Sequence, residues 1–139
     1  MLDDLRVKEF TKDEARRLNP LQLALIGDAV YEIYIRNYII SENIELSVHK
    51  IHVKAIKYVK AKSQSDIVKA LGNDLLEEEE YIYKRGRNSK SGTIPKNADV
   101  IDYKNATGFE ALVGYLYLTG QKERLTFILK KSIEIIKNT

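Results

Sequence analysis

Two acidic residues, Asp28 and Glu110, interrupt segments of the chain that otherwise have the apolar pattern of buried helices. Asp28 is flanked at helical spacing by Leu21, Ala24, Leu25 and Tyr31. Glu110 lies between Phe109 and Ala111, with Ala106 and Gly114 one turn away. Burying an isolated carboxylate costs several kcal/mol or forces it to take up a proton, so a buried acid needs a partner. A divalent cation is the simplest partner for two acids, and a set of oxygen ligands completed by water suits magnesium. We therefore expect both carboxylates to point into the protein and to converge on one metal ion.

Small residues beside both acids would allow the two helices to approach each other closely. These residues are Gly27, Ala29, Ala111 and Gly114. Neither acid is diagnostic alone, because a lone Asp or Glu in a helix is more often a cap, a member of an ion pair or a partly exposed residue. The pair becomes informative only if the two segments cross at the small residues.

Three other polar residues could be mistaken for metal ligands. Glu32 lies one turn after Asp28, but Arg36 follows four residues later and offers an ordinary ion pair, which is the better explanation. His49 and His52 share a helix face without an acid nearby, which is a weak metal signal. We expect both histidines on the surface, on a side that could face nucleic acid.

The remaining pattern predicts an all-α fold in one domain that covers residues 1–139. Asn19 and Pro20 predict the start of a long helix, and Ser47 predicts the cap of the next. Ser63 and Asp66 resemble a capping box, and Gly72 marks a helix end. The expected helices cover about 20–40, 47–59, 63–72, 74–86, 105–118 and 121–137, with a long loop over 86–103. A loop of this length in a compact domain is usually functional.

Positive charge is concentrated in two stretches without acids, residues 46–65 and 81–98, although the net charge is only +3. In the first stretch, Lys50, Lys54 and Lys57 follow helical spacing and form a ladder on one face. Such patches attract polyanions, usually nucleic acid, but they are equally expected of a solvated helix face. Charge alone therefore leaves both interpretations open.

Composition excludes several classes of protein. The chain has no cysteine, which removes disulfides, thiolate metal sites and cysteine nucleophiles. Its first residues lack the pattern of an export signal, and no segment approaches the roughly 20 apolar residues of a membrane helix. We therefore expect a cytoplasmic protein without a membrane partner.

Three motifs together resemble the ribonuclease III superfamily. LALIGDAVYEIYIR, residues 23–36, resembles its signature helix, and GFEALVGYLYL, residues 108–118, resembles its second acidic helix. KRGRNSKSGTIPKNADV, residues 84–100, is similar to the basic loop of the Mini-ribonuclease III branch, which consists of a catalytic domain only. The order and spacing of the three motifs are much more specific than any one of them.

The resemblance implies a homodimeric endoribonuclease that hydrolyses double-stranded RNA with metal-activated water. By position, Asp28 and Glu110 match the catalytic, metal-binding acids, with Mg²⁺ as the cofactor and Mn²⁺ as a substitute. Full-length relatives carry two further acids at places that here hold Ala24 and Thr107, which leaves the number of ions and the other ligands open. Apolar side chains such as Tyr31, Tyr34 and Ile35 are expected to supply the dimer patch.

Because the resemblance includes no separate RNA-binding domain, the expected RNA contacts lie in the basic stretches. They are Lys50, Lys54, Lys57, Lys84, Arg85, Arg87, Asn88, Lys90, Ser91, Lys96 and Asn97. The family's usual role implies trimming of 23S ribosomal RNA precursor, helped by a large-subunit ribosomal protein. Two alternatives remain: a non-catalytic RNA-binding or ribosome-associated domain of the same fold, and a helical protein-interaction module.

Overall fold

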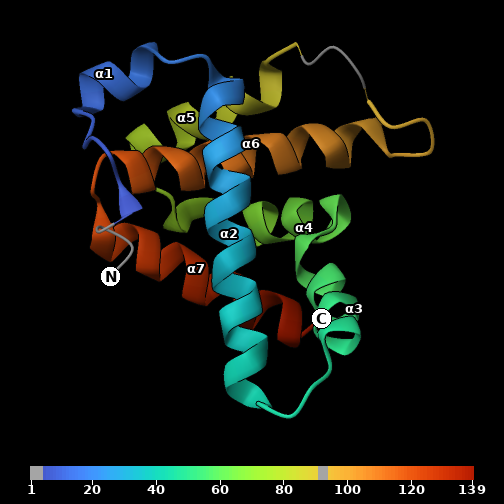
Figure 1. Cartoon of the computed structure of the whole chain (residues 1–139). Coiled ribbons are helices and arrows are strands. Elements are labelled where there is room, and N and C mark those ends of the chain that lie inside the picture. Colours follow the sequence, from blue (N-terminus) through green and yellow to red (C-terminus); the bar gives the residue numbers. More distant parts are fainter. Residues whose placement is uncertain (1–4, 91–93) are drawn as a thin grey trace.

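The computed structural model describes residues 5–90 and 94–139, and every regular element in those residues is helical (Figure 1). The α-helices are α1 (Lys12–Arg17), α2 (Pro20–Glu42), α3 (Val48–Val59), α4 (Ala61–Leu71), α5 (Glu77–Asn88), α6 (Val100–Leu118) and α7 (Lys122–Lys137), with a short 3₁₀ helix η2 (Gly72–Asp74) before α5. The predicted all-α class is confirmed. Among the described residues, no helix is long and apolar enough to cross a membrane.

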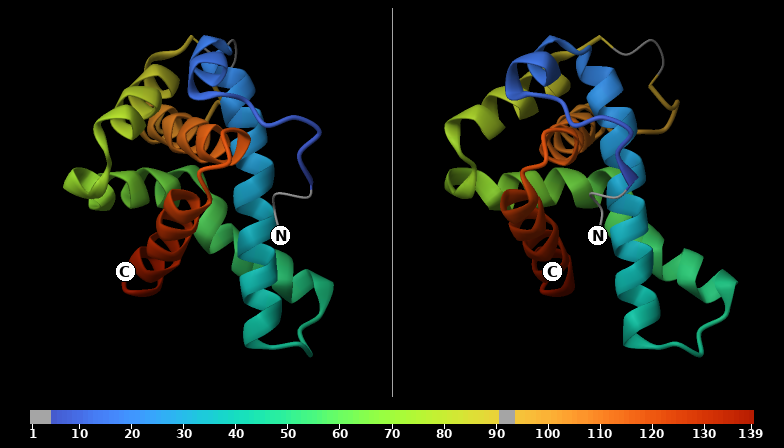
Figure 2. Two further views of the ribbon diagram at one scale, coloured as in Figure 1. Left: turned by 90° about the vertical axis from the view of Figure 1, so that its left-hand side faces the viewer. Right: turned by 60° about the vertical axis from the view of Figure 1, so that its left-hand side comes forward.

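α2 and α6 form the centre of the molecule. α6 is buried along most of its length and packs against α2, α4 and α5. Figure 2 shows α5, α6 and α7 on one side of α2. The core includes the fully buried rings of Tyr31, Phe109 and Tyr115, and the first two meet edge to face at 5.2 Å between ring centres.

The predicted start of α2 is confirmed by a complete capping box. The Asn19 side chain accepts a hydrogen bond from the Leu21 amide at 2.9 Å, and the Gln22 side chain accepts one from the Asn19 amide at 3.0 Å. The helix continues two residues beyond the expected end at Ile40, to Glu42.

α3 and α4 meet at a sharp joint, because Lys60 ends one helix and begins the other. Ser47 caps α3 as predicted, by accepting a hydrogen bond from the Lys50 amide at 3.2 Å. The predicted capping box of Ser63 and Asp66 is wrong: α4 begins earlier, at Ala61, and the Asp66 carboxylate pairs with Lys62 at 2.9 Å. Gly72 ends α4 with a positive φ of 39°, as expected of a helix-ending glycine.

The predicted bounds of α5 and α6 are also wrong. α5 begins at Glu77 rather than Asp74 and continues past Gly86 to Asn88. Gly86 does not stop the helix, because its missing side chain instead allows close packing: a Cβ atom there would lie 2.9 Å from the Gly108 Cα atom. α6 begins at Val100 rather than near Asn105, capped by Asp99, whose side chain accepts from the Asp102 amide at 3.0 Å. The connection between α5 and α6, residues 89–99, is therefore shorter than the expected loop, and residues 91–93 lie outside the described part.

α1 was not expected from the sequence, although its signal is present. The Thr11 side chain accepts from the Glu14 amide at 3.1 Å, and the Glu14 side chain accepts from the Thr11 amide at 3.0 Å. Thr followed three residues later by Glu is the usual sequence pattern of a capping box.

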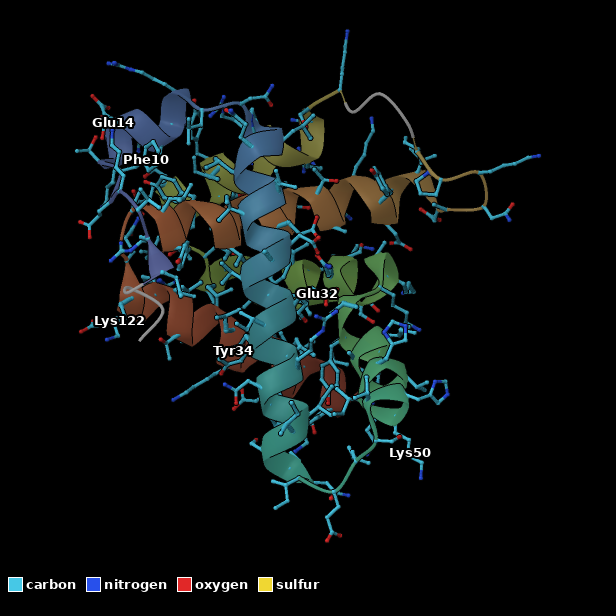
Figure 3. The ribbon with its side chains drawn as sticks, viewed as in Figure 1. Phe10, Glu14, Glu32, Tyr34, Lys50 and Lys122 are labelled. Carbon is cyan, nitrogen blue, oxygen red and sulfur yellow. The ribbon has the colours of Figure 1, made fainter. Side chains whose placement is uncertain are left out.

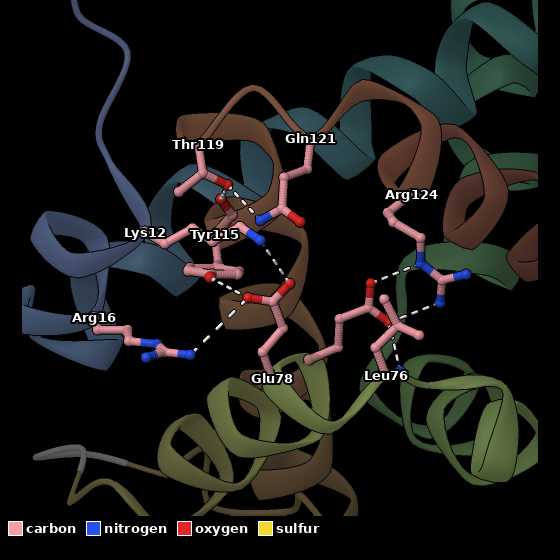
Figure 4. A network of polar contacts seen from close by, with 9 residues as sticks. Lys12, Arg16, Leu76, Glu78, Tyr115, Thr119, Gln121 and Arg124 are labelled. Atoms are coloured by element: carbon pink, nitrogen blue, oxygen red, sulfur yellow. Dashed lines mark hydrogen bonds and ion pairs between the residues drawn. The ribbon is translucent and has the colours of Figure 1, made fainter.

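Four glutamates, residues 77–80, form the first turn of α5, where carboxylates complement the helix dipole, and two of them also bind other helices. Figure 4 shows Glu78 between Lys12 of α1 and Tyr115 of α6, whose hydroxyl donates to it at 2.9 Å. The neighbouring Glu79 is fully buried and accepts two hydrogen bonds from Arg124 of α7, at 2.7 and 2.8 Å. These carboxylates attach α5 to three other helices.

Candidate functional site

The site begins with the crossing of α2 and α6, which touch through their main chains. A Cβ atom on Gly27 would lie only 1.7 Å from the Glu110 carbonyl oxygen, and one on Gly114 only 1.9 Å from the Leu23 carbonyl oxygen. Only glycine fits at either position without moving a helix. The predicted close approach is thus present at Gly27 and Gly114, whereas Ala29 is exposed and Ala111 faces Gly86 of α5.

This crossing brings Asp28 and Glu110 together. The Asp28 side chain lies within hydrogen-bonding reach of the Glu110 carboxyl. Asp28 follows Gly27 directly in the chain, and the Glu110 main chain touches Gly27, so the contact is a direct result of the glycine crossing. Two acids separated by more than 80 positions in the sequence therefore share one small volume.

Electrostatics at this pair favour a proton or a cation. Burial is the main cause that raises the pKa of Glu110 from 4.5 to about 8, followed by the negative charge of Asp28 and the hydrogen bond with it. Glu32 adds a smaller repulsion, and a hydrogen bond from Gln64 opposes the others. A carboxyl with such a high pKa is one whose negative charge has no sufficient partner in the protein.

Asp28 is exposed, and the prediction that it points into the protein is wrong. The face of α2 that the sequence predicted to be buried around Asp28 includes Leu25, which is 73% exposed. The buried face of α2 is instead centred on Leu23, Gly27 and Tyr31. Asp28 lies at the edge of that face, so the pair has one inner acid, Glu110, and one outer acid.

Gln64 of α4 is a third member of the site that the sequence analysis missed. Its side-chain amide donates to a Glu110 carboxylate oxygen at 3.3 Å, and the residue is only 2% exposed. A signal was available in the sequence, because Gln64 precedes Ile67, Val68 and Leu71 at helical spacing and is a polar residue in an apolar stripe, as Glu110 is.

Glu32 and the two histidines lie where expected. Glu32 pairs with Arg36 at 2.7 Å and lies on the side of α2 that faces α4 (Figure 3). His49 and His52 are exposed on α3. Ala24 is buried, and Thr107 is half-buried with its hydroxyl donating to the Tyr103 carbonyl at 3.1 Å, so neither of these two positions supplies a further acid to the site.

A metal ion fits the donors of this site, with most of its ligands supplied by water. Within residues 5–90 and 94–139, no group of three or more His, Cys, Asp or Glu side chains is arranged to hold a metal. Asp28 and Glu110 nevertheless offer carboxylate oxygens at one point, and their mutual repulsion is relieved by a cation. Hard ions such as magnesium are usually held by one or two carboxylates and several waters.

The basic residues of α3 form an exposed ladder. Lys50, Lys54 and Lys57 are all exposed, and Lys50 extends from the outer side of α3 in Figure 3. The apolar residues of α3 are only partly covered, because Val48 is 83% exposed and Ile56 is 44% exposed. The helix is buried instead through Ala55 and Tyr58.

The second basic stretch is divided between structural and exposed groups. Arg85 donates to the Arg16 and Leu18 carbonyls at 2.5 and 3.4 Å, so its guanidinium is engaged by the chain between α1 and α2. Lys84 pairs with Glu80 at 3.1 Å, and Arg87 lies 5.6 Å from the centre of the Tyr83 ring. Asn88, Lys90, Lys96 and Asn97 are exposed. Ser91 and Gly92 lie outside the described residues.

The glycine crossing of α2 and α6 brings exposed Asp28 next to partly buried Glu110, and two carboxylates that meet in this way can hold the metal ion of a nuclease. The ribonuclease III domain model matches residues 21–121, which include both acids, and the chain belongs to the ribonuclease III family. It is an endoribonuclease of the ribonuclease III type.

Relatives refine this assignment to one branch of the family. Mini-ribonuclease 3 of Clostridium tetani is 51% identical over 132 residues, which cover 95% of this chain and 87% of the relative. Mini-ribonuclease 3 of a Thermoanaerobacter species is 50% identical over 128 residues, covering 92% and 89%. The crystal structure of a protein from Fusobacterium nucleatum is similar with a TM-score of 0.76 at 36% identity, and covers 86% of this chain and 94% of that one.

Proposed function

We propose that this chain hydrolyses phosphodiester bonds of double-stranded RNA at the Asp28–Glu110 pair, with Mg²⁺ as its ion and Mn²⁺ as an alternative. Membership of the ribonuclease III family gives the type of reaction and the duplex substrate. The observation that supports the location is the approach of Asp28 to partly buried Glu110, where burial first and the charge of Asp28 second raise the pKa of Glu110 to about 8 and favour a bound cation. Family members generally depend on a divalent metal, and oxygen ligands favour magnesium.

The two acids have different tasks because they differ in exposure. Glu110 is the inner residue and would anchor the ion, while exposed Asp28 would complete its protein ligands on the open side, where RNA arrives. When bound, a divalent ion lowers the pKa of water and stabilises negative charge on a phosphate. No His, Lys or further acid is needed in the proposal as a general base.

Substrate binding is proposed to use both basic surfaces. A-form RNA is recognised through its phosphates and 2′-hydroxyls, for which exposed lysines on a helix and a loop are suitable. The ladder of Lys50, Lys54 and Lys57 is the better supported surface, because all three side chains are exposed. Affinity should fall steeply with salt as counterions are displaced.

A second apolar face of α2 supports the proposed homodimer. Leu25, Ala29 and Ile33 recur every four residues and are exposed. A helix that is apolar on opposite faces is normally covered on both. The expected dimer patch of Tyr31, Tyr34 and Ile35 is wrong for two of its members, because Tyr31 and Ile35 are fully buried within the chain and cannot reach a partner.

The biological setting follows from the branch. We propose that residues 1–139 act as one catalytic domain in the cytoplasm, on a stem of 23S ribosomal RNA precursor. A large-subunit ribosomal protein is proposed as a helper, by analogy with the family.

The test compares the parent with Asp28→Asn and Glu110→Gln on long duplex RNA with Mg²⁺. We expect cleavage by the parent, no cleavage by either variant and retained RNA binding by all three. Glu42→Gln, an exposed acid at the end of the same helix as Asp28, is the matched control and should cleave normally. Binding without cleavage by the parent would favour the non-catalytic RNA-binding domain, and absence of binding would favour the protein-interaction module.

A further inference from the structure

Three consecutive polar side chains in the first two turns of α4 (Ala61–Leu71) are buried. Ser63, Gln64 and Ser65 are 4%, 2% and 0% exposed. Buried polar groups are costly unless hydrogen-bonded, so their partners indicate what they do. Ser63 donates to the Lys57 carbonyl at 2.5 Å, and Ser65 accepts from Asn105 of α6 at 3.0 Å. Both of these contacts are structural, and neither touches the pair of acids.

Gln64 differs because its amide nitrogen has two acceptors of different kinds. It donates to the Val59 carbonyl at 2.8 Å and to the Glu110 carboxylate at 3.3 Å. Val59 is the last residue of α3, where helix carbonyls lack partners within the helix. The first bond therefore holds the amide against a fixed main-chain atom, and the second N–H is directed at the carboxylate.

The orientation of this amide is determined by its neighbours. The Val59 carbonyl can only accept, so the amide nitrogen must face it and the oxygen must face away. The Gln64 Oε1 atom is buried and has no hydrogen-bond partner in the part of the chain that the structure describes. The amide is therefore held in one orientation, with its nitrogen toward Glu110.

We propose that Gln64 is a positioning residue for Glu110: its amide nitrogen links the carboxylate to the C-terminal end of α3, the helix that carries the basic ladder. This role rests on the proposed function of Asp28 and Glu110. It also connects a surface proposed to bind RNA with the inner acid through two hydrogen bonds.

The test uses Gln64→Met, which removes the donor and the acceptor but keeps a long unbranched side chain. Ser63→Ala is the matched control, because it removes a bond to the same end of α3 without touching Glu110. Three quantities are measured: Mn²⁺ affinity by calorimetry without RNA, the single-turnover cleavage rate with Mg²⁺, and duplex RNA affinity with Ca²⁺.

We expect Gln64→Met to bind Mn²⁺ about 10- to 100-fold more weakly, as is typical when a partner of a metal ligand is removed. The cleavage rate at saturating RNA should fall, and RNA affinity should not change. Ser63→Ala should match the parent in all three measurements. Parent-like Mn²⁺ affinity and cleavage rate in folded Gln64→Met would overturn the proposal.

A second variant covers the case in which Gln64→Met does not fold. Gln64→Asn keeps a buried amide but is one methylene shorter, so it should lose contact with Glu110 and show the same weakened Mn²⁺ binding. Full Mn²⁺ affinity in this variant would also overturn the proposal. If the parent itself neither binds Mn²⁺ nor cleaves RNA, the proposed function has failed rather than the role of Gln64.

Discussion

Replacing Glu110 with glutamine should stabilise the metal-free protein at alkaline pH, although it should abolish activity. Burial and the charge of Asp28 raise the pKa of the Glu110 carboxyl from 4.5 to about 8. Below pH 4.5 the carboxyl is protonated in both the folded and the unfolded chain, and its raised pKa has no effect on stability. As the pH rises, the unfolded chain releases the proton first, so the stability of the folded state falls until the pH exceeds about 8.

The size of this effect follows from the difference between the two pKa values. A difference of about 3.5 corresponds to about 5 kcal/mol, since each pH unit is worth about 1.4 kcal/mol. Because the site is open to solvent on the Asp28 side, we take about 3 to 5 kcal/mol as the expected range. Glutamine cannot ionise, so the variant avoids this loss.

The assay is urea denaturation in EDTA at pH 5 and pH 9, at one protomer concentration. The free energy of unfolding of Glu110→Gln, relative to that of the parent, should increase by about 3 to 4 kcal/mol from pH 5 to pH 9. Glu134→Gln, an exposed acid on α7, should show no such growth. Saturating Mg²⁺ at pH 9 should stabilise the parent but not Glu110→Gln, because only the parent has both ligands.

A parallel loss of stability in parent and variant from pH 5 to pH 9 would refute this reasoning. It would mean that the Glu110 carboxylate is well solvated or already has a cationic partner in the protein. The contact with Asp28 would then not explain the need for a metal.

Three further changes test the fold around the site. Gly27→Ala would place a methyl group 1.7 Å from the Glu110 carbonyl oxygen, so we expect a loss of at least about 3 kcal/mol in urea denaturation, and parent-like stability would show that the crossing is looser. Leu25→Glu should yield a monomer of unchanged helical content in size-exclusion chromatography with light scattering, and a persistent dimer would place the interface elsewhere. Glu79→Gln weakens a buried ion pair with Arg124 and should cost about 3 kcal/mol of stability, whereas an unchanged denaturation midpoint would mean that this pair contributes nothing.

The ends of helices could be predicted from the sequence where nearby residues determine them. The caps at Asn19 and Ser47 and the stop at Gly72 depend on residues within one turn, and all three were found where expected. Gly86 was misread as a stop, because its real role depends on Gly108, which is 22 positions away. A glycine that permits helix packing and a glycine that ends a helix look the same in the sequence.

The two acids of the site could be predicted from the sequence, but the exposure of Asp28 and the presence of Gln64 could not. Asp28 and Glu110 were expected to meet, and the structure brings them into contact. The exposure of Asp28 could not be predicted, because α2 is apolar around its circumference and the pattern does not say which face is inside. Gln64 was overlooked because an amide within an apolar stripe attracts less notice than a carboxylate.

The contact between Gly27 and the Glu110 carbonyl has a consequence for how this protein tolerates change. The main chains of α2 and α6 touch at Gly27. The distance between Asp28 and Glu110 is therefore set by this main-chain contact and not by the shapes of the surrounding apolar side chains. Substitutions among the aliphatic residues of α4 or α7 can therefore accumulate, altering the melting temperature while the gap between the carboxylates stays the same. Changing the distance between the carboxylates would instead require substitution of Gly27 or Gly114, where the addition of a single methyl group would push the two helices apart.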